Sequence, residues 1–319
     1  MKLYFIINPA AKNGLSLRVW NKVEKQLKHQ HIYYQAYFTK CPGDGIKQVK
    51  KILQNTKDRI LIIAVGGDGT IHEILNGVYP MKNGIVGYIP AGSGNDFVRG
   101  YRLPRNPKKA TEHILHLLGA YKKIPIARNV DCGRFQVKAS NRGCFFNNLG
   151  VGFDATVAKK VNESKVKRIY NKLGLGKLIY LLFLLKVLFI YKPTRIKMNI
   201  DGQIKVFERV WLVTVSNQPY FGGGLKIAPD AVVDDGFLDV TVVYNITRWK
   251  ILLLFITVLW GGHRTIKGVY FTKGKKIFIE TDKTIPIHAD GEYKGDESVS
   301  VQVKEKAVSL LNGIETRHL

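Results

Sequence analysis

The sequence predicts a two-domain protein in which an α/β domain is followed by a β-rich domain. The first 128 residues or so alternate short apolar runs with helical patterns, which is typical of parallel strands joined by crossover helices. After about residue 129 the pattern changes to apolar strands separated by turns, which indicates a largely antiparallel arrangement. With 319 residues, of which 45% are hydrophobic and 23% charged, the chain is long enough to bury one core in each domain.

Four strands are expected in the first domain, at residues 3–7, 33–38, 60–65 and 85–89. A helix should follow the third strand, because Ile71, Ile74, Leu75 and Val78 have the spacing of one helical face. We place this domain at residues 1–128 and expect the C-terminal segment 304–319 to complete it.

The second domain, residues 129–303, should begin its clearest hairpin at residue 195 and turn at Asp201 and Gly202. Further strands are expected at residues 211–215, 237–244, 275–280, 285–289 and 298–303. Two apolar stretches, residues 178–191 and 249–260, are shorter than the roughly 20 residues of a membrane-spanning helix. We expect core helices there and leave open whether either one touches lipid. An active site would lie in the cleft between the two domains.

The charge balance and the cysteines limit the class of protein. There are 50 Lys and Arg against 24 Asp and Glu, a formal net charge of +26, which attracts nucleic acid or an anionic membrane. Three widely spaced cysteines without a CxxC pair indicate reduced thiols rather than zinc ligands. Asn8 and Pro9 end the first apolar run before it reaches the length of a signal-peptide core, so a cytoplasmic protein is expected.

The strongest chemical signal is the run Gly66, Gly67, Asp68, Gly69 and Thr70, which follows an expected strand and precedes the helix that begins near Ile71. Glycines let a backbone approach a phosphate closely, and the amides at a helix N-terminus favour its negative charge. The alternative is a tight turn with a capping threonine. Neither GxxxxGK[ST] nor a protein-kinase signature is present, so the common phosphoryl-transfer templates do not apply.

This run resembles the GGDGT nucleotide-binding motif of the diacylglycerol kinase catalytic family, the soluble bacterial lipid kinases related to sphingosine kinases. Five further segments, beginning at Asn8, occur in the family's order along the chain. The resemblance thus covers nearly the whole chain. The resemblance implies an α/β domain like that of NAD kinases and phosphofructokinases, followed by an antiparallel β-sandwich. It assigns ATP binding to Asn8, Pro9, Ala10, Ala11, Lys12, Thr39, Gly66, Gly67, Asp68, Gly69, Thr70, Ile71, His72 and Ser93. Lys12 departs from the glycine that usually ends the family's first motif.

A second loop, residues 92–97, resembles the family element that lies near the phosphates and the acceptor. It implies that Asn95 and Asp96 bind substrate or phosphate and that Ser93 binds ATP. NAD kinases and phosphofructokinases carry GGDG elements but lack this one. The alternative is a loop capped by an Asx turn.

In the second domain the resemblance implies two catalytic carboxylates besides Asp68. Asp154 would join a network of water and catalytic magnesium, and Glu292 would be the general base that deprotonates the acceptor hydroxyl. Alone, Asp154 could be a helix cap and Glu292 part of a hairpin turn.

The resemblance also implies a structural magnesium ion, held by the side chain of Asp235 and the carbonyls of Val232 and Phe237. Hard, small cations prefer oxygen ligands and retain waters, which suits so small a protein contribution. A turn without metal is the alternative.

The sequence therefore predicts a kinase that uses ATP and Mg²⁺ to phosphorylate a lipid hydroxyl, with diacylglycerol converted to phosphatidic acid. Sphingoid bases, phosphatidylglycerol or a soluble alcohol are alternative acceptors. A non-catalytic basic protein that binds membranes or nucleic acid is the alternative of another class.

The expected partner is a lipid in an anionic membrane and not nucleic acid, with peripheral attachment; a homodimer is compatible with these features. Two basic clusters could hold the membrane: Arg99, Arg102, Arg105, Lys108 and Lys109, and Lys159, Lys160, Lys165, Lys167, Arg168 and Lys172. Solvated helix faces are the other interpretation of these clusters.

Overall fold

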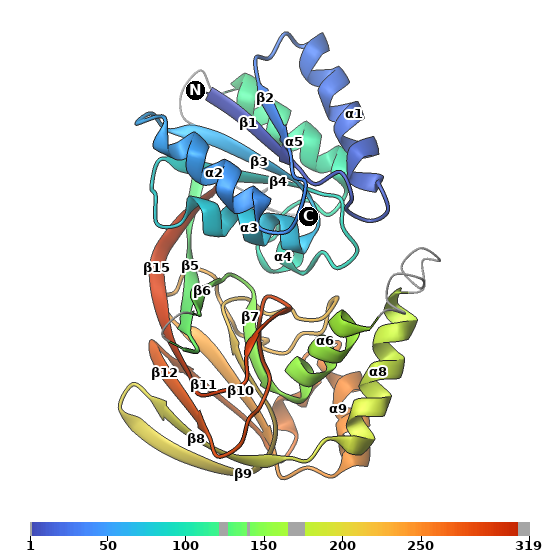
Figure 1. Cartoon of the computed structure of the whole chain (residues 1–319), viewed down its shortest axis with the longest axis vertical. Coiled ribbons are helices and arrows are strands. Elements are labelled where there is room, and N and C mark those ends of the chain that lie inside the picture. The colour runs from blue at the N-terminus through green and yellow to red at the C-terminus, as the bar shows by residue number, and fades with distance from the viewer. Residues whose placement is uncertain (1, 121–126, 139–140, 165–175, 312–319) are drawn as a thin grey trace. The chain divides into compact units, whose positions relative to one another are not determined.

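The computed structural model describes residues 2–120, 127–138, 141–164 and 176–311, and the chain divides into two compact units (Figure 1). Unit 1 comprises Met1–Asp131 and Glu305–Leu319, and unit 2 comprises Cys132–Lys304. Two strands, β5 (Ala127–Gln136) and β15 (Val299–Leu311), each begin in one unit and end in the other.

Unit 1 is a parallel sheet with the strand order β2-β1-β3-β4-β15. Its strands besides β15 are β1 (Lys2–Ile7), β2 (Gln35–Phe38), β3 (Ile60–Gly66) and β4 (Gly84–Pro90). Its helices are α1 (Leu15–His29), α2 (Asp44–Gln54), α3 (Asp68–Val78), α4 (Asp96–Gly100) and α5 (Pro107–Ala120). The last strand joins the sheet at Ser309 and Leu310, which pair with Ile85 and Val86 of β4.

Helices cover both faces of this sheet, which explains why every residue of β3 and β4 is buried. Alternate strand residues such as Phe5 and Ile63 pack against α1 and α5 in one core cluster. The expected apolar face of α3 is confirmed, since Ile71, Ile74, Leu75 and Val78 are fully buried. The helix begins at Asp68, earlier than expected, because the Gly67 carbonyl already accepts the amides of Thr70 and Ile71 at 2.9 and 3.2 Å.

Unit 2 is built from antiparallel strand pairs that enclose a core of Val, Ile, Leu and Phe side chains. Its strands besides β5 and β15 are β6 (Arg142–Phe145), β7 (Asn148–Gly152), β8 (Thr194–Ile200), β9 (Gln203–Ser216), β10 (Leu238–Tyr244), β11 (Val269–Gly274), β12 (Lys276–Thr281), β13 (Ile287–Ala289) and β14 (Glu292–Gly295). The α/β and antiparallel halves expected from the sequence are therefore confirmed.

The expected hairpin of β8 and β9 turns at Asp201 and Gly202, whose φ angles are 50° and 91°. The prediction of a separate strand at residues 211–215 was wrong, because these residues belong to β9, which continues to Ser216. Near Arg209, whose φ angle is 52°, the β8–β9 register shifts, and β9 goes on to pair with β7 and β10. A bulge of this kind bends a strand without ending it, which the sequence pattern does not reveal.

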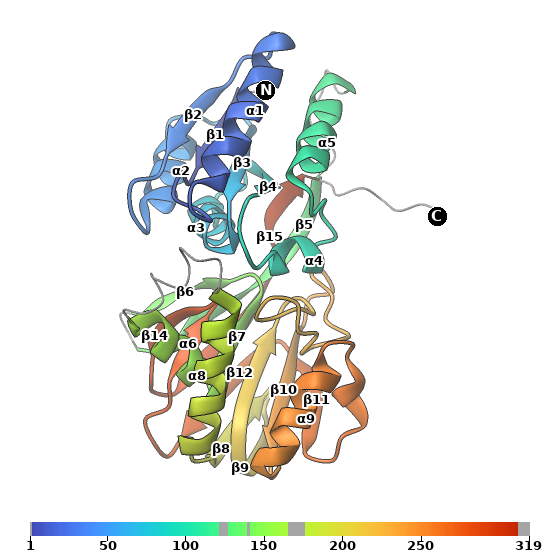
Figure 2. The same ribbon diagram turned by 90° about the vertical axis from the view of Figure 1, so that its right-hand side faces the viewer.

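Three α-helices of unit 2 pack together on a second core beside β9: α6 (Phe153–Glu163), α8 (Gly176–Ile190) and α9 (Arg248–Val258). A 3₁₀ turn, η1 (Gly262–Thr265), follows α9. In Figures 1 and 2, α8 and α9 lie on the same side of unit 2. Within the described residues, no helix combines the length and the apolar character needed to cross a bilayer.

Candidate active site

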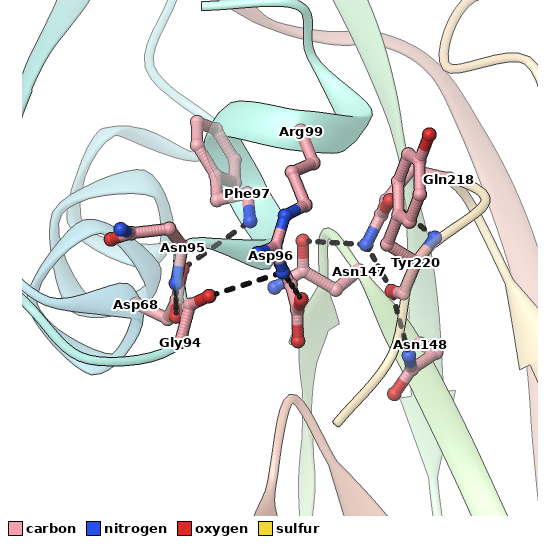
Figure 3. Close-up of polar contacts among 10 residues, drawn as sticks. All are labelled: Asp68, Gly94, Asn95, Asp96, Phe97, Arg99, Asn147, Asn148, Gln218 and Tyr220. Carbon is pink, nitrogen blue, oxygen red and sulfur yellow. Dashed lines mark hydrogen bonds and ion pairs between the residues drawn. The ribbon is translucent and has the colours of Figure 1, made fainter. Parts of the chain in front are cut away.

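The glycine run lies at the carboxyl end of β3, where Gly66 closes the strand and Gly67 precedes the first turn of α3. Asp68 in that first turn adds a negative charge beside the helix N-terminus. The carboxylate of Asp68 accepts the amide of Asn95 at 2.8 Å and the amide of Phe97 at 3.3 Å (Figure 3). Asp68 therefore joins the run at residues 66–70 to the loop at residues 92–97.

These two loops touch through their glycines. A methyl group on Gly92 would collide with the Cα atom of Gly67, so the chain needs glycine at Gly92 for this close approach. The phenol of Tyr88 donates a hydrogen bond to the Gly66 carbonyl at 3.1 Å. Burial first, and then the charge of Asp68, raise the pKa of Tyr88 well above its usual value, so the phenol stays neutral.

Residues 8–12, the first ATP-binding segment that the resemblance implies, reach the glycine run through Asn8. Its amide Nδ2 donates to Thr70 Oγ1 at 3.2 Å, and its Oδ1 accepts the Ala10 amide at 3.1 Å. Lys12 has a φ angle of 47°, in the left-handed region that favours glycine. The departure at Lys12 therefore keeps the backbone conformation that a glycine would adopt.

The other predicted ATP residues differ in what they can offer a nucleotide. Pro9 and Ala11 belong to the same turn as Asn8, and the Thr39 amide donates to the Ile7 carbonyl at 2.9 Å, beside the end of β1. Ile71 is fully buried and His72 nearly so, which leaves their side chains little surface for a ligand.

The second loop presents one exposed and two half-buried polar side chains. Ser93 is exposed, and Asp96 forms an ion pair with Arg99 at 3.2 Å. Asn95 has a φ angle of 61°, and its buried Oδ1 accepts no hydrogen bond from any residue that the structure describes. An unpartnered buried oxygen is costly, so a ligand donor at Asn95 would be stabilising.

In unit 2, Asp154 lies in the first turn of α6 and is 4% exposed. His288 Nδ1 accepts the Gly291 amide at 3.3 Å, so a neutral His288 carries its proton on Nε2 and donates it to Asp154 Oδ2 at 3.0 Å. A Cβ atom on Gly150 would collide with both side chains, so this pair needs glycine there. Burial and then the charge of Asp154 raise the pKa of Tyr191.

An apolar pocket in unit 2 has Asp154 and Thr214 as its polar lining residues. The remaining lining residues are Phe153, Val157, Leu184, Leu212, Phe221, Leu225, Ile227, Leu254, Phe255 and Val258. Asp154 Oδ1 and Thr214 Oγ1 are buried and without a hydrogen-bond partner among the described residues. The pocket therefore joins an apolar wall to two oxygens that have no partner in the described part of the chain.

Glu292 begins β14, directly after the turn made by Asp290 and Gly291. Its side chain is 51% exposed, and its Oε2 lies 2.8 Å from Lys294 Nζ. Asp290 accepts the backbone amides of Phe146, Asn147 and Asn148 at 2.9, 2.9 and 3.0 Å. Asp290 thereby fixes the hairpin that carries Glu292.

The loop assigned to structural magnesium contacts a cation from β11, the ammonium of Lys273. Asp235 Oδ2 lies 2.9 Å from Lys273 Nζ, and the same ammonium lies 3.5 Å from Asp239 Oδ2 and 3.4 Å from the Asp230 carbonyl. Asp235 Oδ1 accepts the Phe237 amide at 3.0 Å. Val232 is exposed, and no cluster of three metal-binding side chains exists within the described residues. As arranged, the Lys273 ammonium neutralises Asp235. The magnesium site stays a prediction, because it rests on one carboxylate and two backbone carbonyls rather than on a cluster of side chains.

Several polar residues near these elements were not singled out from the sequence. Besides His288 and Asp290, they include three amide side chains of unit 2 that bond to one another or to the backbone of Tyr220: Asn147, Asn148 and Gln218 (Figure 3). Gln218 Nε2 donates to Asn147 Oδ1 at 3.3 Å, and Asn148 Nδ2 donates to the Tyr220 carbonyl at 3.5 Å. A run of polar residues directly after an apolar strand was the signal at Gln218.

The predicted basic clusters are partly engaged. Arg99 pairs with Asp96, Lys108 lies 3.8 Å from Glu112, and the Lys159 ammonium lies 4.3 Å from the ring centroid of Tyr293. Lys165, Lys167, Arg168 and Lys172 lie outside the described residues.

Comparison with known proteins gives consistent matches over most of the chain. Residues 2–128 match the diacylglycerol kinase catalytic domain, and residues 147–312 match the YegS C-terminal NAD kinase beta sandwich-like domain. The Bacillus subtilis protein YtlR, assigned as a lipid kinase, is 33% identical over 92% of this chain and 93% of its own. A diacylglycerol kinase of the same organism is 28% identical over 91% and 89%.

A solved structure shares the arrangement. The crystal structure of a Bacillus anthracis protein assigned as a diacylglycerol kinase matches with a TM-score of 0.76 and 25% identity, over 98% of both chains. The glycine loops on an α/β sheet and the β-sandwich-like unit, together with these relatives, identify a lipid kinase. More particularly, the chain belongs to the diacylglycerol kinase family.

Proposed function

We propose that the protein transfers the γ-phosphoryl group of magnesium-bound ATP to the hydroxyl of a membrane lipid, and that diacylglycerol is the preferred acceptor. The observation that carries the proposal is the pair of glycine loops that Asp68 joins at the start of α3. In unit 2 an apolar pocket adds buried oxygens of Asp154 and Thr214 that have no hydrogen-bond partner among the described residues. The free volume of this pocket is only about 20 Å³, room for one water-sized group, so a lipid tail would enter it only with movement of its apolar walls. The names of the relatives support diacylglycerol as the acceptor.

The donor would bind to unit 1. The first amides of α3 and the positive end of its dipole favour phosphate oxygens, and Asp68 holds the second loop against the first. Asn8 fixes the Thr70 hydroxyl, and Lys12 adds a positive charge to the same group of loops. Preorganised groups of this kind stabilise the charge that develops during phosphoryl transfer.

Glu292 is the proposed general base. Its carboxylate takes the proton of the lipid hydroxyl as that oxygen forms a bond to the γ-phosphorus, and the bond to the β-phosphate oxygen breaks to release ADP. The product is a lipid phosphate monoester. Lys294 and the Asp290-anchored turn hold the base in place.

The test is phosphoryl transfer from labelled ATP to diacylglycerol, sphingosine, ceramide and phosphatidylglycerol in anionic mixed micelles, with products resolved by chromatography. Glu292→Gln should lose about 10²- to 10⁴-fold in turnover while it still binds ATP. The matched control is Glu280→Gln, because Glu280 is similarly exposed and pairs with one lysine, Lys197 at 3.2 Å. Turnover that survives in Glu292→Gln would refute the assignment of the base.

A second acceptor is favoured by one feature. The buried Oδ1 of Asp154, which has no partner among the residues that the structure describes, would accept the ammonium of a sphingoid base. Asp154→Asn should then lower turnover of sphingosine far more than turnover of diacylglycerol. An equal loss for both lipids would count against the sphingoid base.

A further inference from the structure

Helices α8 and α9, which lie on the same side of unit 2 (Figure 2), expose large apolar side chains. The i, i+4, i+7, i+11 spacing of a single helical face relates Trp249, Leu253 and Ile256 on α9 to Trp260, two residues after the helix ends. Three of the four are more than 60% exposed. We call the exposed set the α8–α9 patch, which consists of Leu182, Phe189, Ile190, Trp249, Leu253, Ile256, Leu259 and Trp260.

The two parts of the patch are joined. The ring of Phe189 at the end of α8 packs edge-on against Trp249 at the start of α9, with 5.9 Å between their centroids. Arg248 donates to the carbonyls of Leu188 and Tyr191, which ties α9 to the end of α8. The exposed residues therefore form one surface rather than scattered side chains. A contiguous apolar surface on a folded unit marks an interaction site.

The core does not account for this surface. The opposite face of α9 already packs inward through Ile251, Leu254 and Val258, and α8 does the same through Val187 and Leu188. Both helices are therefore apolar on the outside as well as the inside. The inner faces of the same helices also line the apolar pocket, through Leu184, Leu254, Phe255 and Val258.

The charges around the patch select the occupant. Residues 176–192 and 246–268 contain no Asp or Glu, while Lys186, Lys192, Arg248 and Lys250 are exposed on or beside the helices. A second copy of this chain would bring the same positive charges into contact, which costs free energy. An anionic bilayer attracts them instead, and tryptophan side chains are favoured at the membrane–water interface.

We propose that the α8–α9 patch docks the protein on an anionic membrane, with α8 and α9 lying in the interface. The inference rests on the proposed function, because a kinase that takes its acceptor from a bilayer must reach it there. Helices of 15 and 11 residues are too short to span the hydrocarbon core but suit an interfacial position. Docking by this face would bring the bilayer to the helices that line the acceptor pocket.

The tryptophans provide a direct readout. Trp20 and Trp211 are 2% exposed, whereas Trp249 and Trp260 are 68% and 62% exposed, so vesicle binding should change the emission of the latter pair. With vesicles of mixed phosphatidylglycerol and phosphatidylcholine, and without ATP, the wild type should sediment with the vesicles and its emission should shift to the blue. Replacing both Trp249 and Trp260 by Phe should remove the shift.

The decisive variant is Leu253→Glu, which places a negative charge in the centre of the patch. Its apparent affinity for anionic vesicles should fall at least about tenfold, since burial of one leucine is worth roughly 1.5–3 kcal/mol. Ile204→Glu on β9 is the matched control, because Ile204 is 61% exposed outside the patch, and it should bind as the wild type does. Turnover of a short-chain, water-soluble diacylglycerol should be unchanged in Leu253→Glu.

Three results would overturn the docking proposal. The first is equal vesicle binding by Leu253→Glu and the wild type, and the second is an equal loss of vesicle binding in Ile204→Glu. The third is a wild type that does not bind vesicles but sediments as a dimer, which Leu253→Glu dissociates. Vesicle binding is measured without turnover, so a failure of the proposed reaction would leave this result readable. Conversely, turnover of the water-soluble lipid tests the reaction without the membrane.

Discussion

Lys273 Nζ lies 2.9 Å from Asp235 Oδ2, at the position where the sequence predicted a structural magnesium ion. The ammonium also approaches Asp239 and the Asp230 carbonyl. A lysine can neutralise a group of oxygens as a compact charge with three donors, which is much of what a bound cation contributes. The Lys273 side chain of the protein therefore holds the loop that carries Asp235.

The first prediction concerns this lysine. Lys273→Met should lower the free energy of unfolding by about 1–2 kcal/mol, because it leaves two partly buried carboxylates without their cation. The wild-type melting temperature should not respond to EDTA, whereas the variant should be stabilised by added Mg²⁺. Lys197→Met, which breaks an exposed pair with Glu280, is the control. A wild-type melting temperature that falls in EDTA would contradict the prediction.

A second prediction concerns the link between the two glycine loops. Asp68→Ala removes the acceptor for the amides of Asn95 and Phe97, and hydrogen bonds to charged groups are worth about 1.5–3 kcal/mol. ATP binding, measured by calorimetry, should weaken by roughly 10- to 100-fold. Asp58→Ala, in an exposed turn before β3, should bind ATP normally. Unchanged affinity in Asp68→Ala would show that the loops hold their positions without this carboxylate.

Much of the fold followed from the sequence because hydrophobic spacing is a local signal. The four strands before residue 91 and the apolar face of α3 were confirmed, since each depends on residues that lie close together in the chain. The continuation of β9 past Arg209 was not predicted, because a single residue with positive φ decides whether a strand ends or bends.

The candidate site was predictable where a motif carries the chemistry and hidden where distant residues meet. The glycine run could be read directly, but the partner of Asp154 is His288, 134 positions away. The same holds for Lys273 and Asp235, which are 38 positions apart on different elements. A lysine in an alternating strand pattern gives no local sign that it will neutralise a loop carboxylate.

The third prediction concerns Asp290. Asp290→Ala leaves the amides of Phe146, Asn147 and Asn148 without their acceptor, so the turn before Glu292 should loosen. We expect a loss of about 2 kcal/mol or more in urea unfolding and faster hydrogen exchange at these amides. Turnover should also fall, as we expect it to in Glu292→Gln. The control is Asp282→Ala, which removes an exposed carboxylate after β12 and should change neither stability nor turnover. Normal exchange at residues 146–148 would rule out the anchoring role.

The fourth prediction concerns the contact of Asp154 with His288. Gly150→Ala places a methyl group against both side chains and should separate them, although β7 itself keeps its pairing with β9. Turnover of the lipid should fall while ATP binding stays unchanged, because the change is confined to unit 2. Gly143→Ala on β6 is a milder control, since a methyl group there only approaches the ring of Phe135 at 3.1 Å. Equal turnover in the two variants would remove Asp154 from the acceptor site.

The last prediction is a pH dependence that originates at His263, which is fully buried in the 3₁₀ turn after α9. Burial, as the largest cause, lowers the pKa of His263 below its usual 6.5, although Nε2 lies 3.0 Å from the Ile227 carbonyl. Below about pH 6.5 the unfolded chain therefore binds more protons than the folded one, and stability falls as the pH falls. His263→Gln keeps a nitrogen donor near Ile227 but does not titrate. Its melting temperature should therefore fall less than that of the wild type between pH 7.5 and pH 5.5. These values lie about one unit either side of the usual histidine pKa. His29→Gln, an exposed histidine on α1, should keep the wild-type slope. If His263→Gln also kept the wild-type slope, the acid sensitivity would have to come from other groups.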